Sequence, residues 1–149
     1  MKFSIITVCY NAASYIAETI ESVLSQDYGD FEYLIVDGAS SDDTVEIVKK
    51  YQDDQRLTWL SARDQGIADA MNKGANLAAG DVIAHLNADD YYADKNVLSR
   101  VAEAFQQITE AGWVSSGFTF VTKDRSKIRD VRVRKYSYRR LIRGMAISL

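Results

Sequence analysis

The chain has 149 residues, about one domain's worth, of which 47% are hydrophobic and 26% charged. This composition excludes a disordered tail and a collagen-like fibre, and the chain has no run of about 20 apolar residues that would predict a transmembrane helix. Cys9 is the only cysteine, so an internal disulfide is excluded and a reducing, cytoplasmic location is expected.

The net charge of -3 conceals two segments of opposite charge. Residues 1–122 hold 8 basic and 19 acidic side chains, whereas residues 123–149 hold 10 basic and 2 acidic ones. We expect this basic segment either to be a solvated surface or to be attracted to an anionic membrane, where each Lys or Arg contributes ~1 kcal/mol. Nucleic acid is not expected as a partner, because the acidic body would repel it.

Hydrophobic periodicity predicts strands and helices in alternation along the chain. Four strands are expected, at residues 3–9, 31–36, 56–61 and 82–86. Each is followed by a helical pattern, at residues 14–24, 40–51, 66–79 and 96–108. Ser40 and Asp43 form a capping-box pattern at the second of these helices. Beyond them we expect two paired strands and a last helix, at residues 113–121, 128–133 and 138–145.

This order predicts an α/β fold: a mostly parallel sheet with right-handed crossovers, flanked by helices. The first strand is apolar and β-branched over most of its length, which is typical of a strand buried on both faces. His85, the only histidine, falls in the fourth strand, so it is expected to be a buried structural residue.

Polar or acidic residues follow each of the four main strands: Asn11, Asp37, Asp64 and the pair Asp89-Asp90. Ligands of open α/β sheets bind beyond the carboxyl ends of the strands, so these side chains are expected along one rim. For any single one of them, a role as a helix cap or turn residue stays open. Together they favour a site where a divalent cation bridges a diphosphate and a carboxylate of the pair Asp89-Asp90. Adjacent residues of an extended segment point in opposite directions, so one acid is expected to meet the metal and the other a sugar or a backbone amide.

Five segments, in this order, resemble the family-2 glycosyltransferases with the GT-A fold, over roughly residues 3–92. Residues 4–11 (SIITVCYN) resemble the opening strand of that family, and residues 18–26 (ETIESVLSQ) its first helix. The other three segments are similar to its second strand and turn, to a third-helix signature of one branch, and to the strand leading to the aspartate motif; they are residues 36–44 (VDGASSDDT), 64–74 (DQGIADAMNKG) and 79–90 (AGDVIAHLNADD).

The resemblance implies a Rossmann-like GT-A sheet and an inverting transfer of sugar from a nucleoside-diphosphate sugar. The donor would be UDP-linked, and the acceptor a hydroxyl of a glycan or a lipid-linked molecule. In this family-based interpretation Asp37 hydrogen-bonds the base, while Thr7, Tyr10 and Asn11 line the nucleoside pocket.

The same resemblance implies further donor-side positions at Asp64 and Asn72. Asp89 corresponds to the last acid of the aspartate motif, in contact with the donor and with Mg²⁺ or Mn²⁺, and Asp90 is an alternative metal ligand. Asn87 stands where many members have an aspartate. Its neutral amide can still accept from a sugar hydroxyl or hold a metal-bound water.

A second departure from the family pattern lies in the third helix. Met71 stands where many members have an arginine, and whether Lys73 replaces that charge stays open. The general base of family members lies in an acceptor half that looks incomplete here, so the catalytic residue is unknown. Four acids beyond the aspartate motif are considered, and none is expected to be that base; they are Glu103, Glu110, Asp124 and Asp130.

We therefore expect a single domain, with a donor-binding half at residues 1–92 and, at 93–149, an acceptor half that is truncated before it is complete. Such a chain should bind donor but transfer its sugar poorly. One alternative is a nucleotide-sugar-binding module without turnover. Another is a nucleotidyltransferase, which would usually carry a Gly-rich basic loop after the first strand, where this chain reads YNAA (residues 10–13). The expected location is cytoplasmic, with peripheral contact at the inner membrane face.

Overall fold

The computed structural model describes residues 1–108 and 110–132, and the chain divides into two compact units, Met1–Gln107 and Ile108–Leu149. The donor-binding half predicted at residues 1–92 lies within the first unit, whose core also includes Leu98 and Ala102. None of the helices within the described residues is long and apolar enough to cross a bilayer.

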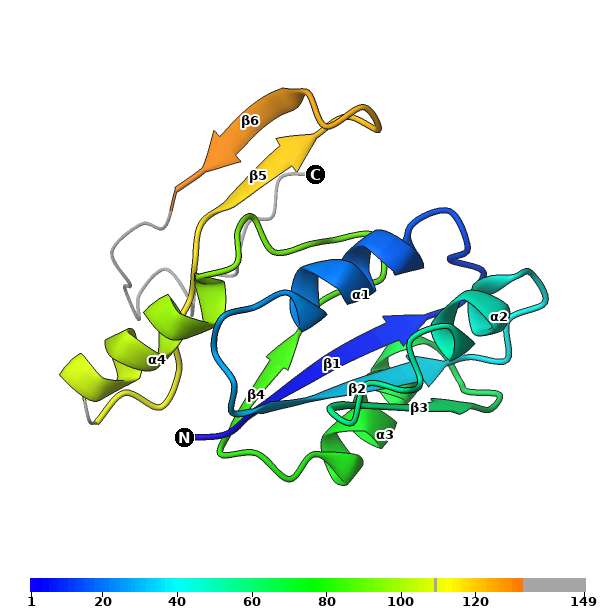
Figure 1. Cartoon of the computed structure of the whole chain (residues 1–149), viewed down its shortest axis with the longest axis horizontal. Coiled ribbons are helices and arrows are strands. Elements are labelled where there is room, and N and C mark those ends of the chain that lie inside the picture. Colours follow the sequence, from blue (N-terminus) through cyan, green and yellow to red (C-terminus); the bar gives the residue numbers. More distant parts are fainter. Residues whose placement is uncertain (109, 133–149) are drawn as a thin grey trace. The chain divides into compact units, whose positions relative to one another are not determined.

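Four parallel strands form the sheet of the first unit, in the order β3-β2-β1-β4 (Figure 1). Their bounds are β1 Phe3–Cys9, β2 Phe31–Asp37, β3 Leu57–Ser61 and β4 Val82–His85. Every residue of β1 is buried, because this strand lies between β2 and β4 and has helices on both faces. The predicted parallel α/β sheet is thereby confirmed.

Helices cover both faces of this sheet (Figure 1). Their bounds are α1 Ile16–Leu24, α2 Thr44–Lys49, α3 Ile67–Leu77 and α4 Val97–Gln107. Side chains of α1, α2 and α4 share one apolar cluster with Phe3, Ile5 and Tyr33, which point to the same face. Alternate strand residues point the other way, and there Ile6 and Val36 pack against α3.

Two local expectations are wrong. The capping box does not form: the helix begins at Thr44, because the Ser40 hydroxyl donates to Asp37 and accepts the Asn11 N–H instead. His85 is exposed rather than buried, since β4 is an edge strand of the described sheet and α3 packs against β1 and β2 instead.

The second unit contains an antiparallel hairpin, β5 Phe118–Val121 and β6 Lys127–Val131. The turn between them includes Arg125 in the left-handed region, at φ 65°. The pairing is as predicted, but β5 begins five residues later than the expected strand at 113–121. The helix expected at 138–145 and the last residue of the strand expected at 128–133 lie outside the described residues.

Candidate functional site

Two adjoining pockets open at the carboxyl ends of the strands. The larger has about 730 Å³ and lies among the ends of β1, β2 and β3 and the first turn of α3. The smaller has about 440 Å³ and lies between the loops that follow β1 and β4. Both are lined by Val8, Cys9, Tyr10 and Ile67, so they form one continuous site. Each volume falls in the range of small-molecule pockets.

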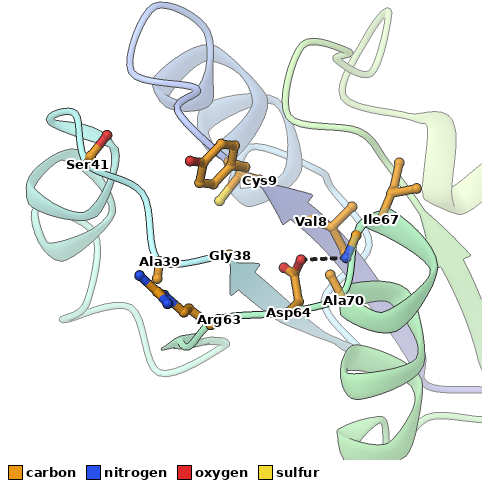
Figure 2. Close-up of a pocket in the computed structure, with 11 residues that line it drawn as sticks. Val8, Cys9, Gly38, Ala39, Ser41, Arg63, Asp64, Ile67 and Ala70 are labelled. Carbon is orange, nitrogen blue, oxygen red and sulfur yellow. Dashed lines mark hydrogen bonds between the residues drawn. The ribbon is translucent and has the colours of Figure 1, made fainter.

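Asp64 and Arg63 bring charge to the larger pocket from the segment after β3 (Figure 2). The Asp64 Oδ1 atom accepts the Gly66 N–H at 2.8 Å, which orients the carboxylate. Gly66 precedes α3 with φ 112°, a conformation that glycine adopts without strain. Gly38 leaves room for this carboxylate, because a Cβ at position 38 would lie 2.6 Å from Asp64 Oδ2.

Tyr10 and Ile67 border both pockets although their side chains are 65% and 62% exposed. Large apolar side chains left open to water beside a pocket are typical of surfaces that a ligand covers. Tyr10 was predicted to lie at the nucleoside pocket, and the structure places it in the lining.

Asn11 joins the loop after β1 to the loop after β2. Its backbone is left-handed, at φ 51°, a conformation that asparagine tolerates better than most residues. Its N–H donates to Ser40 Oγ at 2.8 Å, and its Oδ1 accepts the Ser41 N–H at 2.9 Å. Ala12 N–H donates to Thr44 Oγ1 at 2.8 Å and strengthens the same junction. Asn11 also lines the smaller pocket.

Asp37 lies in neither pocket lining and is 1% exposed. Its Oδ2 accepts the Ser40 N–H at 3.0 Å and the Ser61 hydroxyl at 2.6 Å. Its Oδ1 accepts the Ser40 hydroxyl and, at 3.7 Å, the Cys9 thiol. Burial and the Asp37 charge raise the pKa of Cys9 to about 12, so this thiol is a donor and not a nucleophile.

Two other predicted residues also lie outside both linings. Thr7 is fully buried, and its hydroxyl accepts from Tyr33 at 3.0 Å. Successive side chains of β1 point to opposite faces of the sheet. Val8 reaches the pocket, and the neighbouring Thr7 therefore points to the other face, into the core. Asn72 is exposed on α3.

The smaller pocket ends at the turn after β4, which carries Asn87 and Asp89 in the lining and Asp90 beside them. Asn87 Nδ2 donates to Asp90 Oδ2 at 3.0 Å, and the Asp90 N–H donates to the Asn87 carbonyl at 3.1 Å. The buried Thr19 hydroxyl lies 2.8 Å from the Ala88 carbonyl oxygen and 2.9 Å from that of Asp90. Helix α1 therefore holds the backbone of this turn.

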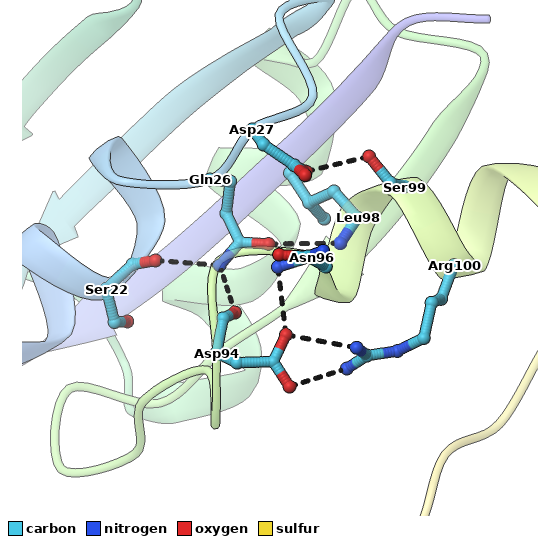
Figure 3. A network of polar contacts seen from close by, with 8 residues as sticks. All are labelled: Ser22, Gln26, Asp27, Asp94, Asn96, Leu98, Ser99 and Arg100. Atoms are coloured by element: carbon cyan, nitrogen blue, oxygen red, sulfur yellow. Dashed lines mark hydrogen bonds and ion pairs between the residues drawn. The ribbon is translucent and has the colours of Figure 1, made fainter.

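The C-terminal end of α1 holds the segment that follows the turn (Figure 3). Gln26 is 6% exposed, and its Nε2 donates to the Asp94 carbonyl at 2.8 Å. Its Oε1 accepts the Leu98 N–H at 3.0 Å and so gives a partner to one of the first N–H groups of α4. Asp27 accepts the Ser99 hydroxyl at 2.7 Å. The acidic turn and the segment that follows it are thus held by a network of polar contacts, of which those from Thr19 to Ala88 and from Leu98 to Gln26 are buried.

Asp89 and Asp90 suit a divalent cation that shares its ligands with a substrate. No cluster of three or more His, Cys, Asp or Glu side chains capable of holding a metal occurs within residues 1–108 and 110–132. Mg²⁺ typically uses one or two carboxylates together with substrate phosphates. The two exposed carboxylates at the end of the smaller pocket fit that requirement, whereas an all-protein cage does not form here.

The sequence did not identify Arg63 as a pocket residue, although it directly precedes Asp64. Met71 of α3 is partly buried and packs against the core, and Lys73 pairs with Asp69 at 3.0 Å and donates to the Arg63 carbonyl at 2.8 Å. Among the described lining residues of the larger pocket, the cationic one is Arg63.

Solved structures with the GT-A fold share this architecture. TarS 1–349 of S. aureus, in complex with UDP-GlcNAc, matches with a TM-score of 0.67 and 28% identity, over 78% of this chain and 38% of TarS 1–349. The mannosyltransferase PcManGT of Pyrobaculum calidifontis, in complex with GDP-Man and Mn²⁺, matches with a TM-score of 0.66 and 24% identity, over 83% of this chain and 36% of that chain.

Curated relatives are glycosyltransferases. A PGL/p-HBAD biosynthesis glycosyltransferase of Mycobacterium bovis is 39% identical over 102 residues, which are 67% of this chain and 40% of the relative. An uncharacterized glycosyltransferase of Nostoc sp. is 36% identical over 108 residues, or 71% of this chain and 33% of the relative. The match thus spans well under half of each relative. The profile of "Glycosyl transferase family 2" matches residues 4–146, and the chain belongs to this family.

Proposed function

We propose that this chain binds a UDP-linked sugar and forms the donor-binding part of a glycosyltransferase. The observation that carries the proposal is the continuous site at the strand ends, which has Asp64 and Arg63 at one end and the acidic turn with Asp89 at the other. A nucleoside diphosphate has two matching ends. Its base can form hydrogen bonds with charged side chains, and its anionic diphosphate can be held at an acidic turn through a divalent cation. TarS, 28% identical, holds UDP-GlcNAc on the same fold.

At the diphosphate end, Asp89 and Asp90 would hold Mg²⁺ or Mn²⁺, which would neutralise charge on the leaving diphosphate. Asn87 orients Asp90 through its 3.0 Å hydrogen bond and offers its amide oxygen to a sugar hydroxyl. Thr19 holds the backbone of this turn from α1, so that the carboxylates need little reordering when the donor binds. Asn72, exposed on α3, remains a predicted donor-side residue.

The reaction is an in-line displacement that inverts the anomeric carbon. Its bond to the diphosphate breaks, a bond to an acceptor hydroxyl oxygen of a glycan or lipid-linked molecule forms, and the hydroxyl proton passes to a general base. Asp124 and Asp130 do not suit that role. Hydrogen bonds from Thr122 and Ser126 lower the pKa of Asp124, and the hydrogen bond from Lys127 lowers that of Asp130. A general base works best with a pKa near the pH of the reaction.

Peripheral contact with an anionic membrane is part of this proposal. The hairpin of the second unit exposes Phe118, Phe120 and Ile128, and all its described basic side chains are exposed. Aromatic and cationic side chains together suit the interface of an anionic bilayer. A protein bound to the membrane through this hairpin would lie close to a lipid-linked acceptor.

Calorimetry with UDP-GlcNAc in Mn²⁺ and in EDTA tests the donor and metal proposals together. In Mn²⁺, Asp89→Asn should weaken UDP-GlcNAc binding by about 10- to 100-fold, the loss in metal affinity typical of substituting residues that surround a metal site. In EDTA the same substitution should change binding little. Asp53→Asn, an exposed acid outside both linings, is the matched control and should bind like the wild type. An equal loss in both buffers would show that Asp89 does not act through a metal.

A further inference from the structure

We infer that Gln26 is a positioning residue for the proposed cation site: it holds the segment that leaves the acidic turn, and thereby fixes Asp89 and Asp90 where a cation bound to the donor can meet them. This inference rests on the proposed function. It adds a residue that lies in neither pocket lining and yet determines how strongly the cation contributes to donor binding.

The chain between β4 and α4 depends on side chains for its position. Residues 86–96 belong to no helix or strand, so the regular ladder of a helix or sheet does not fix them. At the turn itself, the Thr19 hydroxyl has one proton and lies within hydrogen-bond distance of two carbonyls, those of Ala88 and Asp90. One proton cannot satisfy both acceptors fully. The position of the turn therefore depends also on what holds the chain beyond it.

Gln26 holds that part of the chain with both ends of its amide (Figure 3). Its Nε2 donates to the carbonyls of Ser22 at 3.0 Å and of Asp94 at 2.8 Å. Its Oε1 accepts the Leu98 N–H at 3.0 Å, and this contact is buried. A flipped amide would set its NH₂ against that N–H and its oxygen against two carbonyls, so one orientation alone satisfies all three partners.

The contacts that hold the segment continue along one side of α1 and beyond its end. Thr19, Ser22 and Gln26 are three and four residues apart, a spacing that places side chains on the same face of a helix. The Ser22 hydroxyl accepts the Tyr92 N–H at 3.2 Å. Together the three side chains reach a backbone group of every second residue from 88 to 94. Gln26 makes the last of these contacts and also binds the start of α4, so it sets where the segment meets that helix.

This support matters most for the cation, because ordering a loose segment on binding costs conformational entropy. Carboxylates that are already in place meet the cation without that cost. The described lining of the larger pocket comes from β1, the loops after β1 and β2, the segment after β3 and the start of α3. Donor contacts in that pocket should therefore not depend on Gln26, whereas the contribution of the cation should.

Gln26→Met tests the inference, because methionine keeps the unbranched shape of the side chain and removes its hydrogen bonds. Calorimetry with UDP-GlcNAc in Mn²⁺ and in EDTA gives the factor by which the cation strengthens binding. In Gln26→Met we expect this factor to fall about 10-fold, the lower end of the range for residues that support a metal site, with the affinity in EDTA unchanged. Added to Asp89→Asn, Gln26→Met should bring no further loss in Mn²⁺, because the contribution of the cation is already gone.

Ser4→Ala is the control for lost stability. It removes a buried hydroxyl that accepts the Gly80 N–H at 2.8 Å, at the opposite end of the sheet. It should lower the melting temperature and leave the Mn²⁺ factor unchanged. Ser22→Ala is a milder variant that removes the acceptor of the Tyr92 N–H, and it decides the question where Gln26→Met does not fold. It should lower the factor about 2- to 10-fold, as expected for one lost hydrogen bond.

Two results for the wild type would overturn the inference together with the proposal on which it rests. Failure to bind UDP-GlcNAc would overturn the proposed function, and equal binding in Mn²⁺ and EDTA would overturn its metal part. Mn²⁺-strengthened binding by the wild type, with the factor retained in a folded Gln26→Met or, where that variant does not fold, in Ser22→Ala, would overturn the inference alone. Gln26 would then serve only the stability of the fold.

Discussion

Carboxylates around the strand ends differ in how many donors already reach them, and this number separates structural acids from acids available to a ligand. Asp37 receives donors on both oxygens, Asp64 receives one on Oδ1, and no hydrogen bond reaches the Asp89 side chain within the described residues. A saturated carboxylate stabilises the loops around it, because removing it leaves buried donors unpaired. An unsaturated carboxylate at a pocket can exchange water for a ligand at little cost.

Gly38 is the residue-scale test of how Asp64 reaches the pocket. In Gly38→Ala the new Cβ would lie 2.6 Å from Asp64 Oδ2, the far end of a flexible side chain, so the carboxylate should move while the fold persists. We expect UDP affinity to fall about 10-fold or more, comparable to losing a hydrogen bond to a charged group, with a melting temperature near that of the wild type. Calorimetry and thermal denaturation measure the two effects.

Gly29→Ala is the matched control for that substitution, since a Cβ at Gly29 meets nothing within 4 Å. It should alter neither binding nor stability appreciably. Undiminished UDP binding by Gly38→Ala would mean that the position of Asp64 Oδ2 does not matter to the donor.

At the scale of elements, the sheet is held at its two ends by different polar contacts. The carboxyl ends carry the site. Thr19 of α1 holds the acidic turn, and Gln26, two residues beyond α1, holds the segment that follows it. At the opposite end, Glu32 of β2 accepts from Lys2 Nζ at 2.8 Å, from the Ser4 hydroxyl at 2.5 Å and from the Ala79 N–H at 2.6 Å. This cluster ties the connection between α3 and β4 to the two central strands.

Glu32 gives the first unit a specific sensitivity to acid. Burial alone would raise its pKa, but the hydrogen bonds from Lys2, Ser4 and Ala79 outweigh burial and lower the pKa from 4.5 to about 2. Because the folded value lies below the unfolded one, the stabilisation is full above about pH 5 and is lost as the pH falls toward 2. Glu32→Gln should therefore melt below the wild type at pH 6, and the gap should narrow on acidification to pH 3.

Thermal denaturation of both proteins across this pH range measures the gap. Glu46→Gln, on the exposed face of α2, is the control and should show a small gap at every pH. A gap between Glu32→Gln and wild type that stays constant from pH 6 to pH 3 would contradict the assigned pKa of Glu32.

Periodicity predicted the elements well because burial controls it: the four sheet strands and four helices lie within about four residues of their expected bounds. The site was predictable only in part. Asp64, Asn87 and Asp89 line pockets, since each follows a strand, and their roles toward a donor stay predictions. Asp37 does not, because neighbouring hydroxyls engage it, and no periodic pattern reports such contacts. The sequence did not predict Arg63 as a pocket residue, because the path of the loop after β3 brings it there and the sequence pattern does not report that path.

At the scale of the whole molecule, the pockets and the basic charge are divided between the two units. Among the described residues, those that line the two pockets all belong to Met1–Gln107, whereas the basic segment at 123–149 lies in the second unit. Substitutions in one unit should therefore affect one property at a time. This separability distinguishes a membrane-contacting surface from a surface that merely keeps the protein soluble.

The charge of the hairpin should control binding to anionic vesicles. Lys123 and Arg132 are exposed in the second unit, and each basic residue near anionic headgroups contributes ~1 kcal/mol, so Lys123→Glu with Arg132→Glu should weaken binding to phosphatidylglycerol vesicles by about 30-fold or more. UDP affinity should not change, because neither residue lines a pocket.

Lys50→Glu with Lys95→Glu, an equal charge reversal in the first unit, is the control and should bind vesicles nearly as well as the wild type. Wild-type binding should also fall in high salt, since screening shortens the reach of the attraction. Co-sedimentation measures each case, and equal losses in the two double variants would assign the effect to net charge rather than to the hairpin.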